Sequence, residues 1–161
     1  MPEMMRTLEY LRGITPEETR RLRKLGVRNT LELLHVTSLI IDRERVEART
    51  GIPQPRLLEF AHQSALLEIS GADRFIPVLR RLGVTSQKDL KKADPADLHA
   101  RLVDATGPTT APTRGDIEYW ISQARSIDVI EDDLDPEPPV QVSSPSLLGT
   151  PPDAQSTVTR A

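Results

Sequence analysis

The feature that most constrains the fold is a helical unit that is written twice, 57 residues apart. The first copy spans residues 8–34 and the second spans residues 66–90. Each copy has a glycine at a turn, Gly13 or Gly71, followed by a helix that stops at Leu-Gly-Val. Repeated units of this kind bury their apolar faces against one another, so the repeat predicts a tandem, all-α fold.

Capping residues place the helix boundaries. Thr15, Pro16 and Glu18 match a capping box with proline at the first helical position, which predicts a helix that ends at Gly26. In the second copy, Pro77 would remove a hydrogen bond from a helix that began near Asp73, so a later start is expected. The predicted N-caps of other helices are Asn29 or Thr30, Asp42, Ser86 and Asp94.

The apolar pattern predicts how these helices pack. A largely apolar helix after the Ile52–Pro55 stretch is expected to be the central strut for both copies. Ile117, Trp120, Ile121 and Ala124 form one face of a closing helix. We expect Trp120 and the leucines of both copies to share one core.

These blocks resemble the helix-hairpin-helix superfamily, and most closely a doubled helix-hairpin-helix family described as a domain of unknown function. The resemblance also includes the segment Asp94–Leu102 and the final helix with Trp120, so it covers roughly residues 1–126. It implies two hairpins with degenerate glycines, because Thr15 replaces the second glycine of the family pattern.

Charge and composition divide the chain at the same point. Residues 1–126 carry a net charge of +3, whereas residues 127–161 carry −6 and six prolines. We expect residues 1–126 to form the domain and residues 127–161 to form an acidic, Pro/Ser-rich tail, disordered from residue 135 onward.

Several function classes are not expected. The chain has no cysteine, and no apolar run approaches membrane-spanning length. The start at Met1 lacks a signal-peptide pattern, so a cytoplasmic location is predicted. His35, His62 and His99 have no carboxylate at metal-ligand spacing, and no catalytic motif is found, so we predict no metal, no cofactor and no enzymatic activity.

The resemblance implies where a nucleic acid would bind. In DNA-binding relatives, the glycine turn presents backbone N–H groups to a phosphate. The candidate residues are Gly13, Arg20, Arg21, Lys24 and Arg28 in the first copy and Gly71, Lys88 and Lys91 in the second. Thr15, Glu17, Glu18 and Asp73 oppose this role because they place a cap and negative charge at the turns. The alternative is a solvated basic face balanced by Glu17, Glu18 and Glu32.

The start and the middle of the tail contain candidate docking residues for a protein partner. Ile127, Val129 and Ile130 lie among acidic residues, and Leu147 and Leu148 interrupt a polar stretch in the manner of a short linear motif. The alternative for both segments is a plain linker. We therefore predict a non-catalytic protein-interaction or adaptor module, with a DNA-binding accessory protein as the alternative function.

Overall fold

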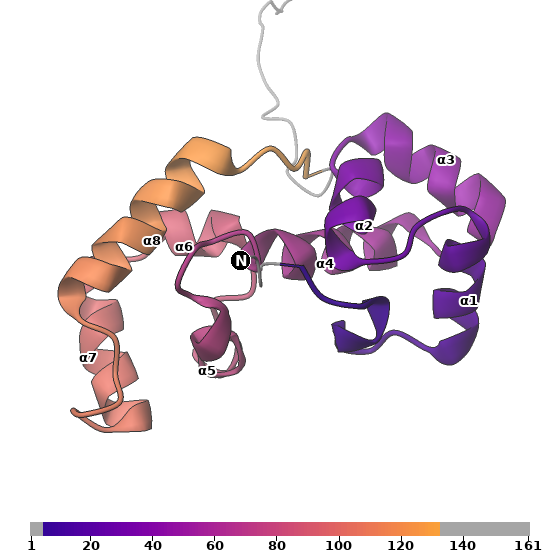
Figure 1. Ribbon diagram of the computed structural model, residues 1–161. Coiled ribbons are helices and arrows are strands. Elements are labelled where there is room, and N and C mark those ends of the chain that lie inside the picture. The colour runs from indigo at the N-terminus through magenta and orange to yellow at the C-terminus, as the bar shows by residue number, and fades with distance from the viewer. Residues whose placement is uncertain (1–4, 133–161) are drawn as a thin grey trace, which may run out of the picture. The chain divides into compact units, whose positions relative to one another are not determined.

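The structure is a computed structural model that describes residues 5–132. The described residues are helical and contain no β-strand, which confirms the all-α prediction; Thr7 and Asn29 form an isolated bridge. The elements are η1 (Leu8–Tyr10), α1 (Pro16–Lys24), α2 (Thr30–Thr37), α3 (Ile40–Thr50), α4 (Gln54–Leu66), η2 (Asp73–Phe75), α5 (Ile76–Arg81), α6 (Gln87–Lys92), α7 (Pro95–Thr106) and α8 (Arg114–Ile127) (Figure 1).

Most of the predicted helix starts are confirmed. Thr15 and Glu18 form the complete capping box at the start of α1. The side chains of Asn29, Ser86 and Asp94 each accept the backbone N–H three residues later, at the starts of α2, α6 and α7. The second copy has the late start that Pro77 predicted, because η2 precedes α5 and Pro77 lies in the first turn of α5.

The predicted cap at Asp42 is wrong. Helix α3 begins two residues earlier, at Ile40, and its N-cap Leu39 makes no side-chain cap hydrogen bond. The Ile40 N–H donates instead to the Glu131 carboxylate, 2.7 Å away. A free N–H at a helix start needs an acceptor, and here a residue 91 positions later in the chain supplies it, so local sequence did not locate this start.

The repeat is longer than residues 8–34 and 66–90. Gly51 ends α3 and Gly107 ends α7, so that α3 corresponds to α7 and α4 corresponds to α8. Gln63 on α4 accepts the Arg12 N–H at 2.8 Å and donates to the Arg12 carbonyl at 3.2 Å. Gln123 on α8 holds Ser70 in the same way, at 2.9 and 3.2 Å.

Each glutamine therefore fixes the residue that precedes a turn glycine. Gly13 and Gly71 both have φ +86°, a left-handed conformation that glycine adopts without strain. Helix α4 thus serves twice: it braces the turn of the first copy and leads into the turn of the second. The long apolar helix is the shared strut that the sequence predicted.

The expectation of one shared core is wrong. The first copy buries Leu8, Leu22, Leu33, Leu57 and Phe60 in one cluster, whereas Trp120 lies in a second cluster with residues of the second copy. A third, smaller cluster contains Leu34, Leu58, Ala61, Ala65 and Ile130.

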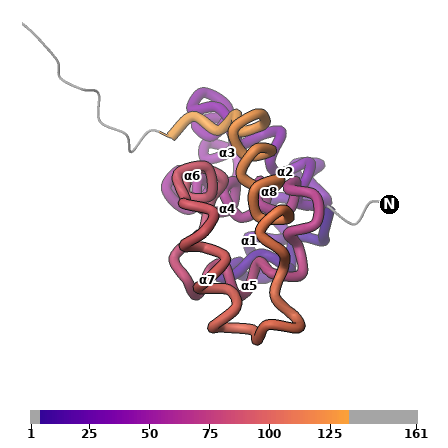
Figure 2. The backbone as a smooth tube through the Cα atoms, turned by 90° about the vertical axis from the view of Figure 1, so that its left-hand side faces the viewer, coloured from indigo at the N-terminus to yellow at the C-terminus, as the bar shows by residue number. Residues whose placement is uncertain are grey.

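The separation follows from the course of α4. The start of this helix contributes Leu57 and Phe60 to the first cluster, and its end contributes Leu66 to the second. In the second copy, α7 and α8 lie side by side (Figure 2), and α8 also packs on α6. Each copy therefore closes its own core around a different part of the shared helix.

Candidate functional site

The predicted basic face of α1 is largely neutralised by carboxylates of the same chain. Glu17 pairs with Arg20, and it pairs with Arg21 at 2.9 Å. Arg21 also donates to the Thr50 carbonyl at 3.0 Å. Lys24 makes no ion pair within residues 5–132. Glu17 therefore competes directly with any phosphate for the two arginines.

The same holds beyond the end of α1. Arg28 donates to Glu32 at 3.1 Å, and Arg23 donates to Glu9 at 2.8 Å. These arginines lower the pKa of Glu32 and of Glu9 below the ordinary value, mainly through side-chain hydrogen bonds. The carboxylates stay ionised at neutral pH. The structure thus brings the predicted cations together, but it supplies each patch with its own anions.

The turn at Gly13 does not offer an open anion site. The Thr15 hydroxyl accepts the Glu18 N–H at 3.0 Å, and the Glu18 carboxylate accepts the Thr15 N–H at 2.9 Å. Arg56 donates to Glu18 at 2.9 Å and also to the Gly13 carbonyl. The Arg56 hydrogen bond lowers the pKa of Glu18. A resident carboxylate therefore takes the backbone donors and the nearby cation that a phosphate would need.

The candidates of the second copy are occupied as well. At the turn that follows Gly71, Asp73 pairs with Arg6 at 3.1 Å. Lys88 and Lys91 on α6 both bind the Asp128 carboxylate, at 2.9 and 2.8 Å. Asp128 is the C-cap of α8, and its side chain is only 2% exposed. This three-residue cluster fastens the end of α8 to α6.

The Asp128 cluster predicts a pH dependence of stability. Burial raises the pKa of Asp128, but the hydrogen bonds from Lys91 and Lys88 lower it further, so that the net shift is downward. A lowered pKa in the folded state stabilises the fold above the unfolded pKa of about 4, and this stabilisation is lost as the pH falls through the folded pKa. We expect Asp128→Asn to cost about 1–2 kcal/mol at pH 7.

The measurement is urea unfolding of the two proteins across an acidic pH series. The difference between the parent and Asp128→Asn should be constant above about pH 5 and should shrink below about pH 4. The exposed Asp104, changed to Asn, is the matched control and should have little effect. A difference that stays constant down to the lowest pH would contradict this role for Asp128.

Of the residues predicted to dock a partner at the start of the tail, Ile130 is bound within the domain itself. Its side chain is 4% exposed and packs on α2 and α4 against Leu34, Leu58 and Ala65. The next residue, Glu131, donates its N–H to the Ser38 carbonyl at 2.7 Å. This corrects the prediction for Ile130, because packing on the domain already satisfies its apolar surface.

The packed domain therefore extends to Glu131, five residues beyond the predicted boundary at 126. Ile127 and Val129 alternate with the packed residues and remain exposed. Leu147, Leu148 and the segment 135–161 lie outside the described residues.

Arg43 is a residue that sequence reasoning missed. It is fully buried on α3, where its guanidinium donates to the carbonyls of Thr37 at 2.7 Å and Ser38 at 3.2 Å, and to that of Glu131. One side chain thus joins the end of α2 to residue 131. Its neighbours in sequence are charged, which is typical of a solvated helix face, so no local signal marked it.

A pocket of about 470 Å³ opens between α2 and α3. Val27, Val36 and Val46 give it apolar walls, and Glu32, His35, Asp42, Arg45 and Arg49 add charged groups. Asp42 and Arg45 pair with each other at 3.0 Å. The pocket combines apolar surface with charges of both signs, and it has no arrangement of nucleophile and base that would indicate catalysis.

The histidines lie apart, with His35 on α2, His62 on α4 and His99 on α7. Within residues 5–132, no group of three or more His, Asp and Glu side chains could hold a metal ion. In the same part of the chain, no helix combines the length and the apolar character needed to cross a bilayer.

Fold and site together define an all-helical protein built from an internal repeat, whose turns and basic faces are satisfied by its own side chains. The chain belongs to the family described as domain of unknown function (DUF4332), which matches residues 12–127. No curated protein and no solved structure matches it.

Proposed function

We propose that residues 5–131 form a doubled, degenerate helix-hairpin-helix domain that acts as a non-catalytic protein-interaction or adaptor module. The two hairpins are the segments around Gly13 and Gly71, each braced from behind by a glutamine. In this proposal the hairpins are structural. The acidic tail carries the partner contact, and the protein works in the cytoplasm.

The observation that carries the proposal is the internal pairing of the predicted phosphate contacts. Arg20, Arg21, Arg28, Lys88 and Lys91 all bind carboxylates of the same chain. Nucleic-acid affinity comes mainly from cations that neutralise phosphates and release counterions. Cations that are already paired supply less of that free energy, which favours a protein partner over DNA.

The experiment tests Leu147 and Leu148 as the docking motif in the full chain. We expect the double variant Leu147→Ser/Leu148→Ser to lose at least half of partner capture, because the two leucines are the apolar residues of an otherwise polar stretch. The measurement is quantitative affinity capture followed by mass spectrometry. Ser143→Ala/Ser144→Ala, in the same segment, is the matched control.

The melting temperature should be the same for all three proteins, because the substitutions lie outside residues 5–131. Equal capture by the leucine variant and the parent would contradict the assignment of the partner contact to the tail. It would place that contact on the helical domain.

A further inference from the structure

The structure holds a second set of arginines that the predicted nucleic-acid face did not include. Arg12 precedes the turn glycine of the first copy, and Arg80 lies on α5 of the second copy. Both reach Gln63: its Oε1 accepts the Arg12 N–H at 2.8 Å and a weaker bond from the Arg80 guanidinium at 3.4 Å. Gln63 therefore brings the two arginines to one place between the copies.

Neither guanidinium has a carboxylate partner within residues 5–132. Arg80 is half-buried, and its pKa is lowered first by burial and then by the charge of Arg12. Tyr10 and Glu59 are the other titratable groups that act on Arg80, and both oppose that shift. Two like charges held together, one of them partly desolvated, are costly without an anion between them.

The repeat itself provides a comparison. Arg80 corresponds to Arg23 in the first copy, at the same offset of 57 residues as the Leu-Gly-Val stops. Arg23 is paired with Glu9 at 2.8 Å. The second copy has kept the arginine without that carboxylate and places Arg12 beside it. The missing partner is therefore specific to this position and is not a general property of the arginines on these helices.

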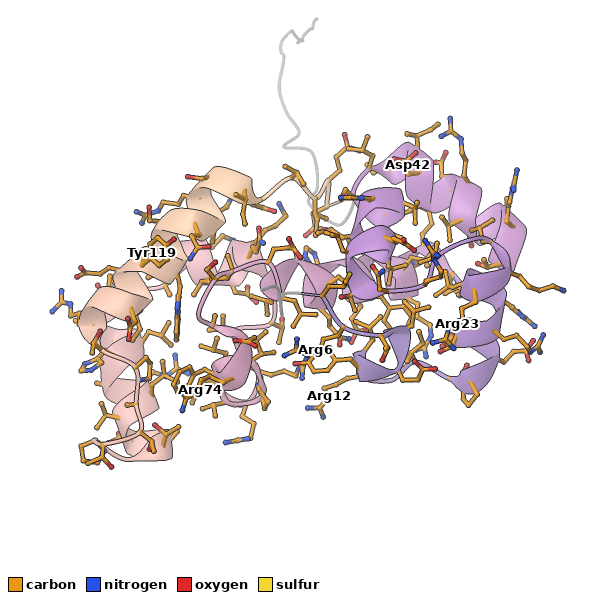
Figure 3. All side chains as sticks on the ribbon, in the orientation of Figure 1. Arg6, Arg12, Arg23, Asp42, Arg74 and Tyr119 are labelled. Atoms are coloured by element: carbon orange, nitrogen blue, oxygen red, sulfur yellow. The ribbon has the colours of Figure 1, made fainter. Side chains whose placement is uncertain are left out.

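The surroundings of the cluster add a third cation. Arg6 lies over the Tyr10 ring, with its Cζ 5.4 Å from the ring centroid, and pairs with Asp73 of the second copy. Figure 3 shows Arg6 and Arg12 between η1 and the α5 segment, with Arg12 at the outer edge of the molecule. Arg12 is exposed, so an anion can reach the cluster from solvent.

We propose that Arg12 and Arg80 form a binding site for a phosphate group. A phosphate presents oxygens in several directions and can accept from two guanidiniums on different elements at once, whereas a carboxylate has two oxygens and is matched by a single guanidinium. This site is distinct from the turn at Gly13, whose donors are occupied, and from the paired face of α1. It does not depend on the proposed adaptor function.

The test is a titration of the full chain with sodium phosphate, followed by NMR of the arginine Nε–Hε signals. We expect the Arg12 and Arg80 signals to shift and saturate. Arg12→Gln and Arg80→Gln should each weaken binding about tenfold, the loss of one charge-assisted contact. Arg23→Gln, the repeat-related control, should bind as the parent does. Arg12 is exposed, so its variant remains informative even if Arg80→Gln fails to fold.

Two further arms identify the source of the phosphate. Binding of a duplex DNA oligomer at low salt that is weakened by Arg12→Gln and unaffected by Arg20→Ala would support the site with a phosphodiester ligand. Binding of inorganic phosphate without DNA binding would support it with a small phosphate. The proposal is overturned if no signal saturates, if Arg23→Gln has the same effect, or if only a glutamate-rich peptide binds.

Discussion

Trp120→Ala is expected to destabilise the fold by about 3–5 kcal/mol. The Trp120 side chain is 2% exposed, and its ring centroid lies 5.6 Å from that of Phe75. Its indole Nε1 also lies against the turn, 3.4 Å from where a Cβ on Gly71 would be. The substitution would leave a large cavity where α8 meets the second turn, with little scope for collapse around it.

Urea unfolding followed by far-ultraviolet circular dichroism measures this cost, because Trp120 is the only tryptophan and its fluorescence is lost in the variant. The adjacent Tyr119 is 58% exposed and points outward from α8 (Figure 3), so Tyr119→Ala should change stability by less than about 0.5 kcal/mol. A loss below about 1 kcal/mol for Trp120→Ala would show that α8 is peripheral.

Ile130→Ala should also be costly, with an expected loss of about 2 kcal/mol or more. Ile130 fills the third cluster against α2 and α4, and its neighbours Asp128 and Glu131 anchor the same segment through Lys88 and the N–H of Ile40. Val129, which is 62% exposed, is the control, and Val129→Ala should be nearly neutral.

The same packing predicts the effect of truncation. A chain that ends at Ile127 should lose stability because it lacks Asp128, Ile130 and Glu131. A chain that ends at Leu134 should keep the melting temperature of the full protein. Equal melting temperatures for the two truncated chains would contradict the assignment of residues 128–131 to the domain.

Features encoded within a few residues were predictable from the sequence. Thr15 caps its own helix, Pro77 delays α5, and Glu17 and Glu32 neutralise arginines one turn away. Each of these effects acts over three or four positions, so the residue pattern contains both partners.

Features that join distant segments were not predictable. Glu131 caps α3, and buried Arg43 binds backbone carbonyls on both sides of the domain. Gln63 and Gln123 had a signal that could have been found: extending the repeat to the two long helices places them at equivalent positions, 60 residues apart. A polar residue repeated within an apolar helix indicates a conserved internal bond of the two copies rather than a solvated face.

The central claim is that the helical domain has given up nucleic-acid binding through its hairpins and α1. The measurement that tests it most directly is the affinity of the full chain for duplex DNA at physiological salt, by fluorescence anisotropy, beside the double variant Arg20→Ala/Lys24→Ala. Because Glu17 and Glu18 occupy the contacts, we predict a Kd no better than about 10⁻⁴ M and no effect of the variant. Micromolar or tighter binding that weakens steeply with salt and disappears in the variant would contradict the claim.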